Sequence, residues 1–423
     1  MAQRADYEGP TILSRGVETV LQGGGELLRL RPYVSLTGVY DTAMTPVSVD
    51  STGKIPQTNN YGEELGLGVY GYHRWQHSVL GIDNRGNVRH YGKNSYYDGS
   101  DHGLSLALTH QPTRRLAFTL REAAGTYSRS YGFSGAYQYV DPAFADVPSN
   151  ELFDGRTDYA STMADLTFSK NQRLSFNIGG SGMIVRRRSK VLIGTNSWSA
   201  RGDLAYRVSR RFTVGVDYGF THYAFTKGFG ASDIHTASGD LSFQLSRLWN
   251  LGLRAGGARV ETLGLRRFAI APILAAILGQ DSILLVMHRR NYVPNIEAKL
   301  SRVFRRSNLS FGYGITVDPG NGLYLTSKSQ NAVLNYSHTA SERWNFGVSG
   351  SHGTYSSLSQ DLGKYTNYSA GAGVTCRLKS WLHLVARYDA RRYEVEGADF
   401  RRIAQRASLG LAFSPGELPL SLF

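Results

Sequence analysis

Strict two-residue alternation is the feature of this sequence that most restricts its fold. In the stretch LAYRVSRRFTVGVDYGF, residues 204–220, every second residue from Phe212 to Phe220 is apolar or aromatic, and the residues between them are small or polar. Successive side chains of an extended strand point to opposite faces, so such a run has one apolar face and one polar face. Only residues 209–211 separate it from a similar run upstream. The stretch therefore predicts a β-hairpin with a tight, arginine-containing turn.

Short basic reversals of this kind recur along the whole chain. Their centres lie about 37 residues apart, except for two gaps of about 58 residues that contain the non-alternating segments 128–157 and 262–287. The alternating runs between them have centres near residues 35, 67, 82, 106, 120, 164, 178, 203, 217, 240, 253, 297, 312, 334, 348, 372, 387 and 408. Connections alternate strictly between short and long, a pattern typical of outer-membrane barrels. The sequence thus predicts an all-β fold, a transmembrane antiparallel up-and-down β-barrel of about 18 strands with short periplasmic turns and longer extracellular loops.

A soluble β-sandwich or propeller is the competing interpretation of the same alternation. The second face of the strands carries many charged residues, and burying them in a dry core would cost several kcal/mol each before pairing. Water inside a barrel removes that cost. A repeat of two strands also does not match the four-stranded blade of a propeller.

The polar faces predict the lining of a water-filled lumen. They contain more arginine and lysine than aspartate and glutamate, which favours a mild preference for anions. Pairs such as Arg201 with Asp203, or Arg387 with Asp389, have the alternative role of bracing the wall. The pore-lining candidates are Arg121, Arg201, Asp203, Arg207, Asp217, Arg254, Glu297, Lys299, Arg387, Asp389 and Arg391.

Composition is consistent with a single barrel domain. No stretch of eighteen uncharged apolar residues occurs, which argues against an ordinary transmembrane helix. The net charge of +14 is spread over turns and strand faces rather than gathered in one patch, so a nucleic-acid partner is not expected. The single cysteine, Cys376, cannot form an internal disulfide and is interpreted as a small hydrophobic residue.

Three parts are expected along the chain. Residues 1–26 form a periplasmic N-terminal segment, residues 27–414 form the transmembrane barrel, and residues 415–423 form a C-terminal periplasmic tail. Met1 and Ala2 suit the end of a secretory signal peptide, so we interpret residues 1–2 as its remnant in a sequence that begins inside a precursor. The terminal Phe423 resembles part of the signal by which outer-membrane proteins are recognised for insertion.

Tryptophan placement indicates where the barrel meets the membrane surface. Four of the five tryptophans directly follow a predicted tight turn, which is where an interfacial aromatic belt is expected. The belt candidates are Trp75, Trp249, Trp344 and Trp381.

The segment FAIAPILAAILGQDSILLVM, residues 268–287, predicts a constriction. It is too interrupted to cross a bilayer as a helix and too apolar for a wet surface loop. We predict that it folds into the mouth of the barrel, and packing on a neighbouring loop is the alternative. The constriction-loop candidates are Phe268, Pro272, Leu278, Asp281 and Met287.

Catalytic and metal-binding motifs do not stand out. Eleven histidines are present, but no motif such as G-x-S-x-G or H-E-x-x-H singles any of them out. His73 and His77 flank a turn and give only a weak indication of a metal pair. We therefore expect no enzymatic activity, no metal and no cofactor.

Several segments resemble one known family. The strand LRLRPYVSLTGVYDT, the preceding GPTILSRG and the ending LGLAFSPGELPLSLF, together with the strand count, are similar to porin-2-like outer-membrane β-barrel proteins of Gram-negative bacteria, of the kind associated with exopolysaccharide export. The resemblance covers the whole chain. It implies a passive conduit in the outer membrane, with outer-membrane lipid and a possible periplasmic polysaccharide-export protein as partners.

The expected function is therefore that of an outer-membrane channel that assists export of an exopolysaccharide, a step that rests on family analogy. Two alternatives stay open. One is a general diffusion porin for small anionic or neutral nutrients. The other is a structural or adhesive barrel with a blocked lumen.

Overall fold

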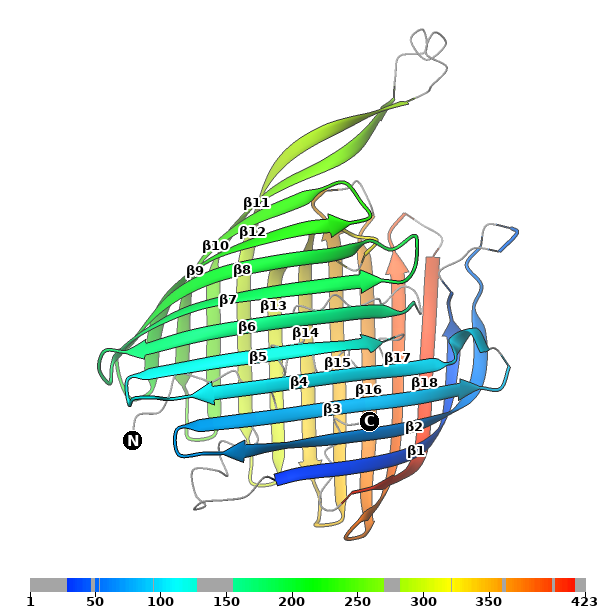
Figure 1. The fold of residues 1–423 in the computed structure, drawn as a ribbon, viewed down its shortest axis with the longest axis horizontal. Helices are drawn as coiled ribbons and strands as arrows, with labels where there is room; N and C mark the ends of the chain where they lie inside the picture. Colours follow the sequence, from blue (N-terminus) through cyan, green and yellow to red (C-terminus); the bar gives the residue numbers. More distant parts are fainter. Residues whose placement is uncertain are drawn as a thin grey trace.

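Eighteen antiparallel strands close into one barrel (Figure 1). The computed structural model describes residues 29–46, 50–52, 54–93, 95–127, 155–269, 282–320, 322–359, 363–397 and 400–414. Closure is direct, because the first strand pairs with the second on one side and with the eighteenth on the other. The expected fold class is confirmed.

The strand bounds show that alternation identified every strand. Each of the predicted centres lies in a different strand. The strands are β1 (Arg29–Met44), β2 (Thr58–Arg74), β3 (Ser78–Tyr91), β4 (Gly99–His110), β5 (Leu116–Tyr127), β6 (Thr157–Ser169), β7 (Leu174–Arg187), β8 (Gly194–Arg207), β9 (Phe212–Thr226), β10 (Ala231–Gln244), β11 (Trp249–Ala269), β12 (Ser282–Val303), β13 (Ser307–Asp318), β14 (Ser327–Thr339), β15 (Trp344–Ser357), β16 (Tyr365–Lys379), β17 (Leu382–Val395) and β18 (Phe400–Phe413).

Helical structure is almost absent from the described residues. It consists there of the 3-10 turn η1 (Ser95–Tyr97). Within those same ranges, no helix has the length and apolar character needed to cross a bilayer. The predicted terminal segments 1–26 and 415–423 lie outside the described residues.

Connection length differs between the two ends of the barrel. At the short-turn end, consecutive strands are joined by two to five residues, and at the long-loop end by four to 29. The predicted strict alternation of short and long connections fails at β9–β10, which are joined by four residues at the long-loop end, as many as in each of the two flanking turns. In the predicted orientation the short-turn end is periplasmic.

The β11–β12 hairpin corrects the prediction of a non-alternating loop over residues 262–287. β11 continues as a strand to Ala269 and β12 begins at Ser282, and the two pair along this whole length. β11 pairs with β10 only as far as Leu263, and β12 pairs with β13 only from Ile296 onward. The end of this hairpin therefore projects beyond the rest of the barrel (Figure 1).

The two faces of the sheet differ sharply in exposure. On β1, Ser35 and Thr37 are buried, whereas Val34 and Leu36, which alternate with them, are 41% and 55% exposed. Residues that lie opposite each other on paired strands share one face of the sheet. The exposed face of β1 therefore continues on its neighbours, because Leu36 lies opposite Leu65 of β2 and Leu411 of β18. An apolar outer face with every backbone group paired along the ladders is what hydrocarbon requires.

The outward face generates a stability prediction. Ile178 of β7 points outward and is 70% exposed, so Ile178→Arg would place a charge in hydrocarbon and lower the free energy of unfolding by about 2–4 kcal/mol. Asn177→Arg is the matched control, because the neighbouring Asn177 points inward beside Asp203. Urea titrations in lipid vesicles measure both, and an equal loss for the two variants would contradict the assignment of faces.

Candidate functional site

The inward faces bring together all of the predicted pore-lining residues. Cross-strand register places them on the same face as Ser35 and Thr37, the buried side of the sheet. They come from β5 (Arg121), β8 (Arg201, Asp203, Arg207), β9 (Asp217), β11 (Arg254), β12 (Glu297, Lys299) and β17 (Arg387, Asp389, Arg391). Their contact with a solute stays a prediction, whereas their position around one interior is a finding.

Arg254 is held by carboxylates from three neighbouring strands. Its Nε lies 2.8 Å from Asp240 Oδ1 and 3.3 Å from Asp217 Oδ1, and its Nη1 lies 3.2 Å from Glu297 Oε2. The sequence analysis missed Asp240, although it continues the polar face of β10 after Ser238. The cluster ties β9, β10, β11 and β12 together and leaves the arginine charge compensated.

Other inward charges are also paired, not always as predicted. Arg201 Nη2 donates to Asp165 Oδ1 at 2.7 Å instead of pairing with Asp203, which accepts a hydrogen bond from Asn177 at 3.0 Å. Arg201 therefore pairs with a carboxylate on another strand rather than with the carboxylate two residues away on β8. Arg387 and Asp389 do pair within β17, through two hydrogen bonds of 2.7 and 2.9 Å.

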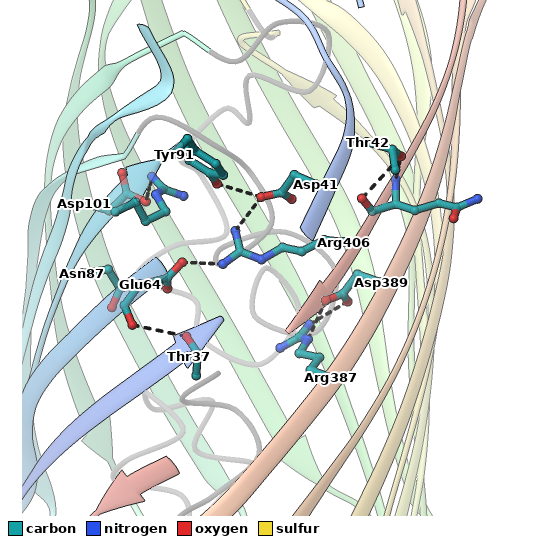
Figure 2. A network of polar contacts seen from close by, with 12 residues as sticks. Thr37, Asp41, Thr42, Glu64, Asn87, Tyr91, Asp101, Arg387, Asp389 and Arg406 are labelled. Carbon is teal, nitrogen blue, oxygen red and sulfur yellow. Dashed lines mark hydrogen bonds and ion pairs between the residues drawn. The ribbon is translucent and has the colours of Figure 1, made fainter. Parts of the chain in front are cut away.

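A nearly buried polar network joins the strands at which the barrel closes (Figure 2). Arg406 of β18 binds Glu64 of β2, and its Nη1 lies 3.9 Å from Asp41 Oδ2 of β1. Tyr91 of β3 donates its hydroxyl to the same Asp41 oxygen at 2.7 Å. Exposure of the Arg406, Glu64 and Asp41 side chains is 12%, 14% and 1%. We call Arg406, Glu64, Asp41 and Tyr91 the seam network, which the sequence analysis did not identify.

Residues 322–326, between β13 and β14, cross the interior at the long-loop end, and we call them the crossing segment. Tyr324 belongs to a buried cluster with β1, β16, β17 and β18, formed by Ala43, Tyr365, Tyr393 and Ala404. Leu325 belongs to a second cluster with β9, β10, β11 and β12, formed by Tyr223, Phe225, Ile234, Ala258, Val260 and Val293. β1 and β10 lie on opposite sides of the eighteen-stranded ring. Two successive side chains thus pack against opposite walls.

Hydrogen bonds fix the crossing segment at several points. The Thr326 and Ser232 hydroxyls are 2.6 Å apart, which ties the segment to β10. The Tyr324 hydroxyl donates to the Gly363 carbonyl oxygen at 2.7 Å, and the Ile193 amide donates to the Gly322 carbonyl oxygen at 2.9 Å. Three separate parts of the barrel therefore hold this short segment in place.

Glycine and burial explain why this segment adopts its path. Gly320, which precedes it, has a φ of +79°, and a Cβ there would lie 1.7 Å from the Tyr324 carbonyl oxygen, so only glycine fits. Burial raises the pKa of the Tyr324 phenol above its usual value. An apolar Leu-Tyr-Leu triplet directly after Pro-Gly-Asn-Gly is the sequence signal that could have indicated an inward loop.

Two of the predicted constriction residues, Phe268 and Met287, do not form this crossing. Phe268 lies opposite Ile283 and Met287 opposite Gly264 in the projecting β11–β12 ladder, which corrects their assignment to a loop in the mouth. Pro272, Leu278 and Asp281 lie outside the described residues. The apolar run was interpreted as a loop because it lacks alternation, whereas backbone pairing within the hairpin extends the strands without any alternating pattern.

The four belt tryptophans all lie at the short-turn end. Trp75, Trp344 and Trp381 are 42–49% exposed. The Arg302 guanidinium lies 4.9 Å from the Trp249 ring centroid, and the Lys379 ammonium 5.6 Å from that of Trp381. These positions suit rings at a membrane surface, and their interfacial role stays a prediction. Of the weak metal pair, His73 contacts the Trp75 ring edge, and no three potential metal ligands gather within the described ranges.

Comparison with known proteins identifies porins among similar structures. No protein-family model and no curated protein matches the sequence. Pseudomonas aeruginosa OpdQ is 10% identical, with a TM-score of 0.40 over 91% of this chain and 97% of that one. OccK2 (OpdF) of the same species, in complex with glucuronate, is 12% identical, with a TM-score of 0.42 over 91% and 98%. A BenF-like porin from Pseudomonas fluorescens Pf-5 is 10% identical, with a TM-score of 0.42 over 92% and 100%.

At these identities and TM-scores no residue role is transferred to this chain. The closed sheet, the apolar exterior and the charged interior of the barrel themselves define an outer-membrane protein of a Gram-negative bacterium.

The seam network generates a second stability prediction. Arg406→Met leaves two nearly buried carboxylates without their guanidinium, and we expect the free energy of unfolding to fall by about 3–5 kcal/mol. Arg392→Met is the control, because its pair with Glu394 is on the outward face and more exposed, so the loss should stay below about 1 kcal/mol. Urea titration in vesicles distinguishes them, and similar losses would remove the special role of the seam network.

Proposed function

We propose that this chain is a narrowed outer-membrane channel for small polar solutes, a porin for nutrient-sized molecules. The observation that carries the proposal is the crossing segment, with Tyr324 and Leu325 packed against opposite walls of a charged interior. A barrel of this strand number has room for an aqueous channel, and a segment stretched across it reduces the passage without filling the whole length.

Export of a polysaccharide is less well supported by the same observation. A long polymer must thread the barrel from end to end, and the crossing segment lies across that path. Small anionic or neutral molecules need only the remaining space. Cationic and anionic side chains both line the interior, as the Arg254 cluster and the Arg387–Asp389 pair show, so discrimination between small cations and small anions should be weak.

The proposal includes no catalytic activity. Two serine–histidine contacts occur on the outward face, Ser78 with His110 at 2.8 Å and Ser307 with His338 at 2.7 Å. Within the described part of the chain, neither histidine has a carboxylate partner to orient it as a catalytic base. These contacts are better explained as cross-strand hydrogen bonds at the short-turn end.

Planar-bilayer recording tests the proposed channel directly. Purified protein inserted from detergent should give discrete ohmic current steps with weak selectivity between chloride and potassium ions. Absence of steps from protein that shows the heat-dependent gel mobility of a folded barrel would favour the blocked structural barrel instead.

The crossing segment generates its own conductance prediction. Tyr324→Ala with Leu325→Ala removes the contacts to both walls, so the segment loosens and single-channel conductance should rise roughly twofold. Val191→Ala is the control, because that loop side chain is 64% exposed and belongs to neither buried cluster. An unchanged conductance in the double variant would show that the crossing segment does not limit ion flow.

A further inference from the structure

The interior is chemically uneven around its circumference. β13, β14, β15 and β16 form a continuous quarter of the wall between the Arg254 cluster on β9–β12 and the Arg387–Asp389 pair on β17. The inward residues of these four strands are almost all serine, threonine, asparagine, glycine or tyrosine. Their charged inward residues are Asp318 and Arg377, which lie at the two ends of the strands. We call this surface the hydroxyl wall.

Register defines the centre of the hydroxyl wall. Ser310 lies opposite Asn335, which lies opposite Ser349, which in turn lies opposite Gly371. One level along, Ser351 of β15 and Ser369 of β16 lie opposite each other with their hydroxyl oxygens 2.6 Å apart. Hydroxyl and amide groups therefore follow one another from Ser310 to Ser349, and the row ends at Gly371, over whose backbone the Asp389 carboxylate of β17 lies.

Glycine opens space for the amides on this wall. A Cβ at Gly353 would lie 2.5 Å from Asn367 Oδ1 and 2.8 Å from Asn331 Oδ1, so the absent side chain lets both amides lie over the backbone of β15. Asn331 also donates to the Ser329 hydroxyl at 2.7 Å. A side chain at position 353 would push these two amides apart. Gly353 therefore helps to position the hydrogen-bonding groups of the hydroxyl wall.

Hydrogen-bonding capacity differs between the hydroxyl wall and its flanks. On the flanks, guanidinium and carboxylate groups satisfy one another, as in the Arg254 cluster and the Arg387–Asp389 pair. On the hydroxyl wall, each serine hydroxyl has one donor and two acceptor positions, and each asparagine amide offers donors and acceptors together. Most of that capacity is not consumed by ion pairs. The hydroxyl wall can therefore form hydrogen bonds with a solute that itself carries both donors and acceptors.

We infer that the hydroxyl wall is a translocation track for uncharged, hydroxyl-rich solutes, that is, neutral sugars. The inference rests on the proposed channel function and narrows its substrate class. A sugar hydroxyl both donates and accepts, so it exchanges hydrogen bonds with water for bonds to successive serine and asparagine groups at little net cost. Weak binding at several sites in series permits both entry and release.

Liposome swelling with paired solutes tests this inference. Glucose and glucuronate share a ring and differ in one carboxylate, so wild-type protein should admit glucose several times faster. Ser351→Ala with Ser369→Ala removes a hydroxyl pair from the wall, and we expect the glucose rate to fall roughly threefold while ionic conductance stays constant.

A second serine pair supplies the matched control. Ser181 of β7 and Ser199 of β8 also face inward with their hydroxyl oxygens 2.7 Å apart, but they lie outside the hydroxyl wall. Ser181→Ala with Ser199→Ala should leave the glucose rate unchanged. Ser351→Thr with Ser369→Thr keeps both hydroxyls and should retain at least most of the wild-type rate.

The outcomes separate the two proposals. Equal effects of the two alanine pairs, no effect of either, or faster entry of glucuronate than glucose would overturn the sugar track while leaving the channel intact. Absence of ionic conductance in the folded wild-type barrel would overturn the channel, and the sugar track with it.

Discussion

Everything in this structure depends on closing the hydrogen-bonded sheet upon itself. A strand in hydrocarbon has no water to satisfy its backbone, so an open edge would cost several kcal/mol for each unpaired group. Pairing of β1 with β18 removes the edges, and the seam network reinforces that junction from the inside through Arg406. Once the sheet is closed, alternation along each strand necessarily separates a lipid face from an interior face.

Different regions of the barrel interior have different chemical features. Paired charges on β9–β12 and at the seam tie neighbouring strands together. At the seam, low exposure also makes each pair dependent on both partners. In the proposed channel the crossing segment narrows the long-loop end, and the hydroxyl wall provides one side that is poor in charge. These regions share one barrel, but each acts through different chemistry, so substitutions in one should leave the others largely intact.

Period-two alternation allowed the eighteen strands and the inward position of residues such as Arg254 and Asp389 to be predicted from sequence. Register converts that local pattern into a shared face without further information. The crossing segment was missed because the burial of Tyr324 and Leu325 depends on walls far away in sequence. Phe268 and Met287 were misplaced because alternation does not mark a ladder whose two faces are both rich in apolar residues. The predicted ion pair of Arg201 with Asp203 was wrong for the same kind of reason. Arg201 contacts Asp165 only because β6, β7 and β8 pair side by side, which the local sequence does not show.

The projecting part of the β11–β12 hairpin has a consequence for how copies of this protein behave together. Among the described residues, β12 has no strand partner besides β11 from Ser282 to Asn295, and from Ser282 to Arg290 this leaves a backbone edge that another strand could approach. Beyond it, Asn291 donates a hydrogen bond to the Leu358 carbonyl oxygen. Arg289 and Arg290 place positive charges on the two opposite faces of this ladder, where Arg290 pairs with Glu261, and Pro294 has no amide hydrogen to donate. Charges and proline at an exposed edge discourage strand addition. The hairpin thus carries its own protection against uncontrolled fibril-like association in a crowded membrane.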